Sequence, residues 1–289
     1  MKTIKKKNKI FFSILLLMVL IIVLPILYYA GRPLPISVRT QLFDGIIYYR
    51  RFHIKPRFLI AHIITVDLDT PGLEFLVTPG DLNTEIPLKA MTTSEFVKKF
   101  DVQVAVNGDG FTPWYSNGFF NYYPHPGDGV TPNGTAISQG IKYHEDSNQP
   151  TIYFTASNHI SFSPPGEERI YNALSGDRMI VENKMAVTGL DDEIPAPRTA
   201  IGISGEGNKL VIVVVDGRQP LYSQGATMSE LAEIMLFYGA DTAMNLDGGG
   251  SSTLVAEKGL GVKVLNSPID RNIPGRERAV GNHLGIIIP

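Results

Sequence analysis

The chain has 289 residues, of which 44% are hydrophobic and 19% are charged, a composition typical of a globular protein with a substantial core. It contains no cysteine, which excludes disulfides and thiolate chemistry and leaves oxygen and histidine ligands for any metal. The formal net charge of −2 becomes about −7 without the five lysines of the first nine residues. Because non-specific binding to nucleic acid needs a positive surface, we expect no nucleic-acid partner. An anionic substrate would have to be held by a few placed arginines.

The first 30 residues predict a helix that spans a membrane. Five lysines precede an apolar run from Ile10 to Leu24, which is interrupted only by Ser13 and continues as far as Tyr29. This length can cross a hydrocarbon core, and the lysines place the N-terminus inside and the rest of the chain outside. We therefore expect a single-pass protein of the cell membrane. The alternative is a cleaved signal peptide that ends near Ala30.

The rest of the chain divides into a short part and a long part. Residues 1–30 are predicted to form a cytoplasmic tail and membrane anchor. Residues 31–57 are rich in Pro, Arg and aromatic residues and predict a short stalk and an entry segment. Residues 58–289 predict one domain, which begins with strands at Phe58–Asp67 and Glu74–Thr78. The expected fold class is α+β, with a strand-rich mixed sheet core, a few capped helices and a strand–helix–strand unit.

A helix is predicted over Thr93–Phe100, because Thr92 and Glu95 have the spacing of a capping box. The strand expected at Val102–Val106 runs directly into a polar turn with the sequence NGDGF, residues 107–111. The next forty residues, which include Trp114, Tyr122, Tyr123, His125 and many Pro and Gly, predict a long structured loop. Long loops in compact domains are usually functional, but a surface excursion with its own aromatic cluster remains the alternative.

The second half of the chain predicts a crossover unit. Strands are expected at 151–155, 178–181 and 199–204, followed by a strongly apolar strand at Lys209–Val215 that ends in Asp216. A helix at Met228–Tyr238, capped by Thr227 and Glu230, leads to a strand at Thr242–Leu246. A crossover of this kind makes the two flanking strands parallel, with their C-terminal ends at one edge of the sheet. Asp216 and Asp247 would then share one crevice.

The crossover ends in the stretch NLDGGGSST, residues 245–253. Three consecutive glycines indicate either a tight turn or a pocket floor at which bare backbone approaches a ligand. The first half of the chain has a similar order, in which a capping box, a helix and a strand precede Asn107 and Asp109. If this is more than coincidence, Asp109 faces Asp247 across the site.

Further strands are expected at 252–256, 262–265 and 284–288. A polar loop precedes the last strand and carries Arg271, Arg276, Arg278, Asn282 and His283. Arg278 and Asn282 just precede the strand and are expected to point inward. His125, His144 and His283 lie in polar segments, and we expect surface roles for them.

Five segments together resemble the phosphodiester glycosidase domain family, which includes the enzyme that uncovers mannose 6-phosphate. They are PRTAIGIS at 197–204, VVVDGR at 213–218, SQGAT at 223–227, NLDGGGSSTL at 245–254, and NSP with RERAVGN near the end. The resemblance covers roughly residues 58–289 and implies hydrolysis of a sugar-1-phosphodiester at the anomeric bond. It implies a pocket lined by Asn107, Asp109, Arg198, Asp216, Asn245, Asp247, Gly248, Gly249, Ser251, Arg278 and Asn282. The chain departs from the family pattern at NGDGF, where Gly110 is inserted before Phe111.

The chemistry of such a substrate suggests roles for these residues. A phosphodiester is a good leaving group, so the protein has to hold the phosphate and stabilise an oxocarbenium-like centre. Arg198 and Arg278 suit the phosphate, although Arg198 could instead pair with Asp216 or Asp247 and fix the loops. Asp247 is our first choice as nucleophile or base, Asp109 the second, and Asp216 is expected to orient the site.

No cofactor is expected to be required, although Ca²⁺ or Mg²⁺ could bind the aspartates through oxygen ligands. The predicted function is a membrane-anchored, extracytoplasmic hydrolase that acts on a cell-surface or exopolysaccharide glycan. Two alternatives stay open on sequence alone. One is a glycan-binding or polymer-assembly protein without turnover, and the other is a phosphodiesterase that cleaves on the far side of phosphorus.

Overall fold

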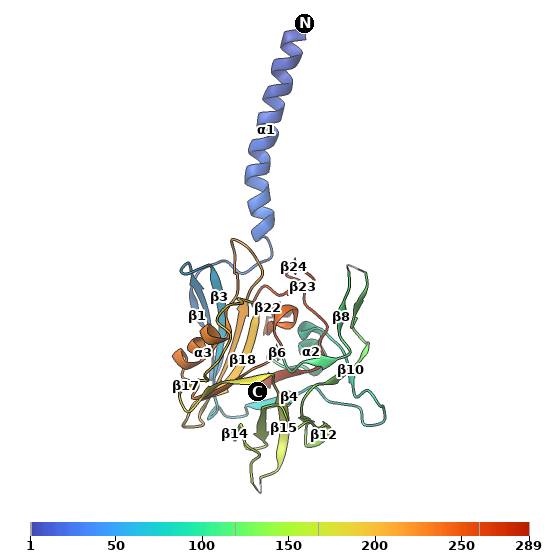
Figure 1. Cartoon of the computed structure of the whole chain (residues 1–289), viewed down its shortest axis with the longest axis vertical. Coiled ribbons are helices and arrows are strands. Elements are labelled where there is room, and N and C mark those ends of the chain that lie inside the picture. The colour runs from blue at the N-terminus through green and yellow to red at the C-terminus, as the bar shows by residue number, and fades with distance from the viewer. Residues whose placement is uncertain (1, 119, 167, 260, 289) are drawn as a thin grey trace. The chain divides into compact units, whose positions relative to one another are not determined.

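The computed structural model describes residues 2–118, 120–166, 168–259 and 261–288, and the side chains of residues 2–10, 25 and 27–29 lie outside this description. The chain separates into two compact units, Met1–Leu34 and Pro35–Pro289. The first unit contains helix α1 (Lys2–Tyr29) (Figure 1). In the described part of the chain no helix is both long and apolar enough to cross a membrane. The predicted transmembrane helix, which falls partly on side chains outside the description, is therefore not supported.

The second unit contains an eight-stranded sheet in which every neighbouring pair is antiparallel. Its strands, in spatial order, are β1 (Val38–Phe43), β2 (Ile46–His53), β3 (Leu59–Asp67), β19 (Lys209–Asp216), β18 (Arg198–Ile203), β20 (Thr242–Asn245), β16 (Arg178–Glu182) and β17 (Met185–Ala186). Because β18 lies between β19 and β20, these two strands run in the same direction. Their C-terminal ends and the first residue of β18 therefore meet at one edge, as the crossover predicts.

A five-stranded sheet packs against the first one. Its strands, in spatial order, are β22 (Gly261–Val264), β21 (Leu254–Lys258), β6 (Val104–Asn107), β25 (His283–Ile287) and β4 (Glu74–Val77). The main hydrophobic core joins alternate residues of the two sheets, for example Ile212 and Val214 of β19 with Val104 and Val106 of β6. Period-2 alternation thus gives each sheet one face toward this core.

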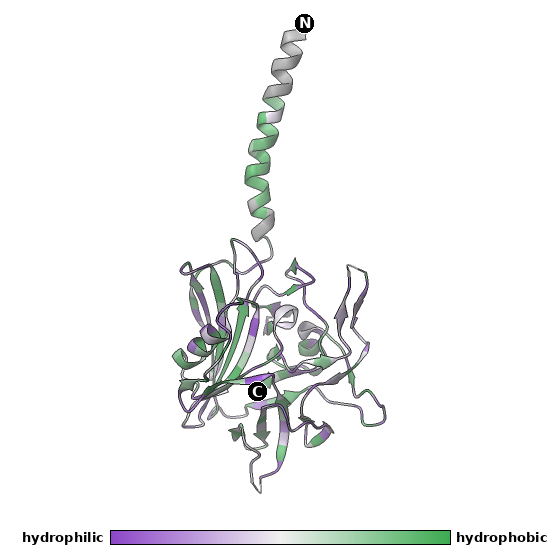
Figure 2. Ribbon diagram, viewed as in Figure 1, coloured by the Kyte–Doolittle hydropathy of each residue, from purple (hydrophilic) through white to green (hydrophobic). Residues whose placement is uncertain are grey.

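The opposite face of each sheet is covered by a helix. Helix α3 (Met228–Phe237) packs on the eight-stranded sheet against Val211 and Val213 of β19, and helix α2 (Thr93–Phe100) packs on the five-stranded sheet. Both helices have the predicted capping boxes. Figure 2 shows hydrophobic residues in green along the strands that Figure 1 labels β3 and β18. The order of layers is helix, sheet, sheet, helix, and the strand-rich α+β class is confirmed.

Smaller sheets extend this frame. The third sheet contains β12 (Ile141–His144), β11 (Ala136–Ser138), β15 (Ile170–Ser175), β13 (Thr151–Thr155) and β14 (Ile160–Ser161). The remaining strands are β5 (Leu88–Lys89), β10 (Gly129–Pro132), β7 (Phe111–Thr112), β8 (Tyr115–Ser116), β9 (Tyr122–Tyr123), β23 (Ile269–Asp270) and β24 (Ile273–Pro274). The loop predicted after Phe111 is therefore organised around short strands, including the β8–β9 hairpin.

The segment expected as a stalk differs from the prediction. Residues 38–53 form β1 and β2, and β2 pairs with β3 along its whole length. Tyr48 and Ile46 of β2 are buried in the main core. Buried and partly buried residues alternate at the start of β2, as in a hairpin with one buried face, but the sequence IIYYRRFH pairs like residues and shows no alternation of apolar and polar residues.

Candidate functional site

The candidate site is a cleft at the edge where β19 and β20 end. The cavity has a volume of about 520 Å³. Its walls contain seven residues that the sequence predicts for the site: Asp109, Arg198, Asn245, Asp247, Gly248, Gly249 and Arg278. They also contain Gly110, Phe111, Trp114, Asn133, Gln149, Asp177, Arg178, Ala196, Pro197, Arg218, Met228, Leu246 and Gly250.

The Gly-rich loop forms the floor of the cleft and connects the two sheets. It leaves β20 at Asn245, makes a short 3-10 turn (η1, Gly249–Ser251), and enters β21 of the other sheet at Leu254. Gly249 has φ +63°, a left-handed conformation that favours glycine. The glycines therefore serve a pocket floor rather than a hairpin turn between neighbouring strands.

Two arginines explain why side chains are excluded from this loop. A Cβ on Gly249 would lie 3.2 Å from the Nη1 atom of Arg218, and one on Gly250 would collide with the Arg278 guanidinium. A Cβ on Gly248 would lie 3.0 Å from the carbonyl oxygen of Pro197. The glycine run thus makes room for two guanidinium groups that lie directly over the loop backbone.

Asp109 lies in the cleft wall and is almost fully buried, with 2% of its surface exposed. Burial, aided by the nearby charge of Asp247 and opposed by backbone donors, raises the pKa of this carboxyl from its ordinary value of 3.8 to about 7. The backbone N–H of Gly134 donates to Oδ2 at 2.6 Å. With its amide nitrogen turned toward Asp109, Gln149 donates to Oδ1 at 3.3 Å. Asp109 can therefore exchange a proton near neutral pH.

Asp247 lies in the same cleft and is partly exposed to it. Burial raises its pKa, while a hydrogen bond from Ser251 and the charge of Arg278 oppose that shift. Its backbone N–H donates to the carbonyl of Gly108 at 3.0 Å, so the two Asp-containing turns are joined directly. The expectation that Asp109 and Asp247 face one site agrees with this geometry. Of the two, Asp247 has the guanidinium beside it that stabilises the ionised form.

Two predicted substrate-binding asparagines are buried behind the cleft and hold its turns instead. Asn107 donates from Nδ2 to the carbonyl of Asp247 at 2.7 Å, and its Oδ1 accepts from Thr199 Oγ1 and from the Thr253 backbone N–H at 3.0 and 3.1 Å. Asn282 accepts from the Asp109 backbone N–H at 2.8 Å. Both residues hold the turns that carry Asp109 and Asp247.

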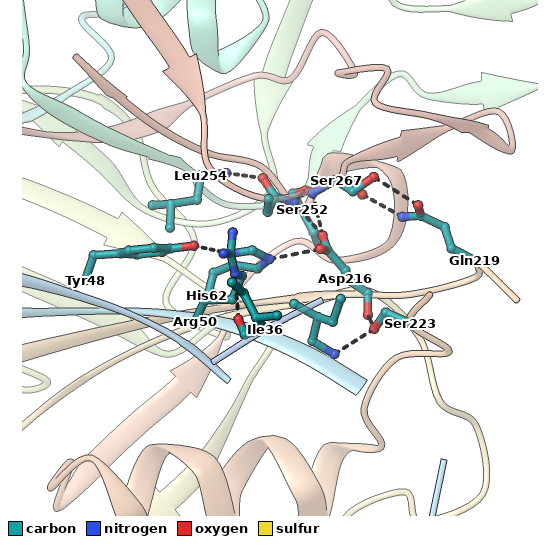
Figure 3. Close-up of polar contacts among 12 residues, drawn as sticks. Ile36, Tyr48, Arg50, His62, Asp216, Gln219, Ser223, Ser252, Leu254 and Ser267 are labelled. Carbon is teal, nitrogen blue, oxygen red and sulfur yellow. Dashed lines mark hydrogen bonds and ion pairs between the residues drawn. The ribbon is translucent and has the colours of Figure 1, made fainter. Parts of the chain in front are cut away.

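Asp216 does not line the cleft, so the predicted crevice shared by Asp216 and Asp247 is wrong. Its buried carboxylate points toward His62 and Ser267 (Figure 3). Alternation along β19 puts its side chain on the same face as Val214, within the main core. Its Oδ2 lies 2.9 Å from His62 Nε2, and its Oδ1 accepts from Asn266 Nδ2 at 3.1 Å and from the Ser267 backbone N–H at 2.7 Å. Among its predicted roles, the geometry fits orientation of the site.

The His62 tautomer follows from these partners. Because the Asp216 carboxylate can only accept, Nε2 of His62 carries the proton, and Nδ1 accepts from the Tyr48 hydroxyl at 2.8 Å. Burial raises the pKa of Tyr48 above its usual range, which keeps this donor protonated. Asn266 extends the network by donating to the Ser252 carbonyl at 3.0 Å and accepting from the Leu254 N–H at 2.9 Å. The exit of the Gly-rich loop is therefore tied to Asp216.

Arg198 and Arg278 have different environments. Arg198 donates to the carbonyls of Ala226 and Ile194, and its ion-pair partner is Asp191 at 3.8 Å rather than either of the predicted aspartates. Arg278 donates to Asp270 Oδ1 at 3.0 Å and to Ser251 Oγ at 3.3 Å. Ser251 is fully buried and supports Arg278 and Asp247 from behind.

Arg218 is the functional candidate that sequence reasoning missed. It has a left-handed backbone with φ +56°, and its guanidinium lies over Gly249. Partial burial and the nearby Arg278 charge lower its pKa. Within the residues that the structure describes, it has no carboxylate partner. Two close guanidiniums, one of them unpaired, favour an anion between them. The signal was available, because Arg218 follows Asp216 at the sheet edge.

The predicted surface role of the histidines is wrong for His283. This residue is fully buried, stacks on Phe96 with ring centroids 4.7 Å apart, and burial lowers its pKa to about 3. It is the first residue of β25, so its side chain enters the sheet. His125 is half exposed and pairs with Asp128 at 3.3 Å, whereas His144 is partly buried and bonds the carbonyl of Gly134.

Polar groups of the cleft remain available for a ligand. Asn245 is 4% exposed, and among the described residues its Oδ1 has no hydrogen-bond partner. A buried acceptor without a donor is costly, so a substrate hydroxyl at this point would be favourable. In the described ranges, no group of three or more Asp, Glu or His side chains is arranged to hold a metal ion. The prediction of a divalent cation stays a prediction.

Comparisons with known proteins agree with the architecture. The sequence model of a family described as phosphodiester glycosidase matches residues 100–287. An uncharacterized SPbeta prophage-derived protein of Bacillus subtilis (strain 168), YomE, is 29% identical over 219 residues, which is 68% of this chain and 30% of that protein. The chain thus spans less than a third of the length of that relative.

Two solved structures share the fold. The catalytic domain of zebrafish N-acetylglucosamine-1-phosphodiester alpha-N-acetylglucosaminidase, auto-inhibited by its pro-peptide, is 19% identical with a TM-score of 0.56, over 91% of this chain and 92% of that chain. A hypothetical protein from Synechocystis is 17% identical with a TM-score of 0.55, over 89% of this chain and 64% of that chain. At these identities the likeness concerns the fold alone.

The raised pKa of Asp109 predicts a pH-dependent stability difference. In the folded state Asp109 keeps its proton up to about pH 7, whereas the unfolded chain releases it near 3.8. Its stabilising contribution is therefore complete below the unfolded value and is lost as the pH rises through 7. Asp109→Asn, which mimics the protonated form, should gain about 2 kcal/mol over wild type between pH 5 and pH 8, as measured by urea unfolding. A difference that does not change with pH would contradict the assigned environment.

Proposed function

The chain belongs to the phosphodiester glycosidase family, and from this membership we propose that it hydrolyses a sugar-1-phosphodiester at the anomeric bond. The observation that carries the proposal is the content of one cleft. Two carboxylates with raised pKa, Asp109 and Asp247, share it with two guanidiniums that lie over a glycine floor, Arg218 and Arg278. A phosphodiester on an anomeric carbon needs both kinds of group.

The phosphate is proposed to bind between Arg218 and Arg278. Each guanidinium can donate two parallel hydrogen bonds to phosphate oxygens, and the close approach of the two positive groups is relieved by an anion. The loop at Gly248–Gly250 presents backbone without side chains toward the same point, while the N–H of Gly249 already donates to the Pro197 carbonyl at 2.9 Å. Arg198 stands at the rim, where its bonds to backbone carbonyls hold the neighbouring segments.

The two carboxylates are proposed to divide the chemistry. When two carboxyls share a cleft, the one beside a cation ionises first, which assigns the negative charge to Asp247 and the proton to Asp109. Asp247 then attacks the anomeric carbon or activates a water there, and it stabilises the oxocarbenium-like transition state. Asp109 supplies or accepts the proton through its pKa of about 7. The unsatisfied Oδ1 of Asn245 takes a sugar hydroxyl.

The natural substrate and its location are separate proposals. A basic start followed by an apolar stretch is typical of exported proteins, and this feature of the first 30 residues is the only support for an extracellular site. We propose cell-surface polymers joined by sugar phosphates, such as exopolysaccharides, as the substrate class. A glycan-binding protein without turnover is the competing function, and the following variants separate the two.

Asp247→Asn should lower kcat/KM for a sugar-1-phosphodiester at least ~100-fold, because the nucleophile or base is lost. The free energy of unfolding should stay within about 1–2 kcal/mol of wild type, since the side chain faces the cleft. The matched control is Asp192→Asn, an exposed position outside the cleft, which should keep wild-type activity. Full activity in Asp247→Asn would refute the assignment, and no hydrolysis by wild type on any such diester would favour the glycan-binding alternative.

Arg218→Ala should lower kcat/KM by roughly 100-fold, because one of the two guanidiniums at the phosphate is removed. Arg178→Ala is the comparison, since Arg178 lines the same cleft but already pairs with Asp177 at 2.7 Å. We expect a clearly smaller loss there. Equal losses in the two variants would show that general positive charge, rather than the position of Arg218, governs phosphate binding.

A further inference from the structure

A separate cavity lies on the face of the eight-stranded sheet that helix α3 covers, between strand β2 and the end of the helix. Its volume is about 350 Å³. Two strands and the helix supply its walls: Arg51 and His53 of β2, Ala61 and Ile63 of β3, and Glu233, Ile234, Phe237 and Tyr238 at the end of α3. These eight residues are distinct from those that line the cleft. We call this cavity the α3 cavity.

Two arginines of the β1–β2 hairpin share one aromatic ring at the α3 cavity. The guanidiniums of Arg39 and Arg51 lie 5.7 and 5.9 Å from the centre of the Tyr49 ring. Arg51 also donates from Nε to the Tyr238 hydroxyl at 2.6 Å, which fixes its orientation. Within the parts of the chain that the structure describes, neither arginine pairs with a carboxylate. Two guanidiniums that gather in this way favour an anion beside them.

The charge of the whole chain is distributed unevenly. Residues 35–57 contain four arginines, one lysine and a single acidic residue, Asp44, which gives a net charge of +4. Because the first 34 residues contribute +6 to a total of −2, residues 58–289 carry −12. Most of the domain therefore repels a polyanion, and outside the cleft the β1–β2 hairpin is the segment that attracts one.

An exposed aromatic ring stands beside these positive groups. Phe237 is the last residue of α3 and is 75% exposed, although helices normally turn large apolar side chains toward the core. Its ring packs edge-on against Tyr238 with centroids 5.2 Å apart. Such a ring can pack against the apolar face of a sugar, while an acid group attached to that sugar reaches Arg51. The α3 cavity thus offers both contacts that one unit of an anionic glycan uses.

Helix α3 sets the distance between the α3 cavity and the cleft. Met228, the first residue of the helix, lines the cleft, and Phe237, the last, lines the α3 cavity. At about 1.5 Å per residue, the two residues lie roughly 14 Å apart along the helix axis. A ligand that occupies both places at once must therefore be a chain of several sugar units.

We propose that the α3 cavity is a second binding site for an anionic sugar-phosphate polymer, which it holds while the cleft cleaves it. The inference rests on the proposed function for the identity of this polymer as substrate. Arg39 and Arg51 bind a phosphodiester of the polymer, and Phe237 packs against the neighbouring sugar. A chain bound at both places raises the local concentration of diesters at the cleft, so a long polymer is a better substrate than a single diester.

The geometry favours a sugar-phosphate polymer over a single-stranded nucleic acid. Proteins bind single strands on successive exposed aromatic faces, on which neighbouring bases stack. At the α3 cavity, guanidiniums lie over the rings of Tyr49 and Tyr238. Phe237 then offers a single exposed ring, which suits one sugar and does not suit a row of bases.

Binding is measured in the Asp247→Asn variant, so that the polymer stays intact. The probe is a phosphomannan whose mannose units are joined by phosphodiesters, and affinity electrophoresis gives the dissociation constant. Adding Arg51→Ala or Phe237→Ala should weaken binding at least ~10-fold, because the first removes a forked donor and the second removes the surface for the sugar. The matched control is Arg169→Ala, an exposed arginine beside β15, which should stay within about 2-fold.

Kinetics with the otherwise unchanged protein separate the α3 cavity from the cleft. On the phosphomannan, Arg51→Ala and Phe237→Ala should raise KM about 10-fold with little change in kcat, because the chain is held less well. On the methyl diester of mannose 1-phosphate, which is too short to reach the α3 cavity, both variants should keep kcat/KM within about 2-fold of wild type.

Four results would overturn the second site. They are no binding of phosphomannan, an affinity in Arg51→Ala or Phe237→Ala equal to that of Arg169→Ala, tighter binding of poly(dT) than of phosphomannan, or an equal loss of activity on the small diester and the polymer. The binding measurement needs no turnover. A protein that binds phosphomannan as predicted but hydrolyses neither substrate would keep the second site and refute the hydrolase.

Discussion

The buried carboxylate of Asp216 is the constraint on which the site depends. A charge in the space between two sheets is costly unless its partners are all in place, and here three donors meet it from His62, Asn266 and Ser267. Those donors belong to β3 and to the segment after β22, which come from different sheets and opposite halves of the chain. Satisfying this one carboxylate therefore fixes how the two sheets meet at the edge that carries the cleft.

The hydrogen bonds around Asp216 also fix the position of the Gly-rich loop. Asn266 holds Ser252 and Leu254 at the loop exit, and Asn107 holds the Asp247 carbonyl near its beginning. With both ends fixed, the glycines between them can accept two guanidiniums without any side chain of their own. The cleft thus presents carboxylates and positive groups at fixed positions before a substrate arrives, which is how enzymes stabilise charge that develops in a transition state.

Much of this could be predicted from sequence because the signals are local. The capping boxes at Thr92 and Thr227 place both helices, and the crossover between β19 and β20 places Asp247 at the sheet edge. The similar order of elements in the two halves of the chain predicts Asp109 opposite Asp247, and both residues line the cleft. Features that depend on which face of a strand a residue occupies were harder. The order of elements predicts that Asp216 and Asp247 share a crevice, yet the alternation of side chains along β19 turns Asp216 into the core. The same alternation buries His283 at the start of β25.

Other features depend on long-range pairing that no local pattern specifies. The strands β1 and β2 are stabilised by their register against β3, and nothing within residues 38–53 alone identifies that partner. Arg218 was overlooked although it follows Asp216 at the sheet edge, because the role of its side chain depends on its proximity to Gly249 and Arg278 in the folded chain. The sequence motifs identify which types of side chain the site contains, but only the tertiary structure shows which of these side chains lie close to one another.

The most direct test of the account is the position of bond cleavage. The protein should be incubated with a sugar-1-phosphodiester in H₂¹⁸O, and the two products should be analysed by mass spectrometry. Attack at the anomeric carbon, which we propose for Asp247 or a water that it activates, places the label in the released sugar. Label in the phosphomonoester would mean attack at phosphorus and would contradict the central claim.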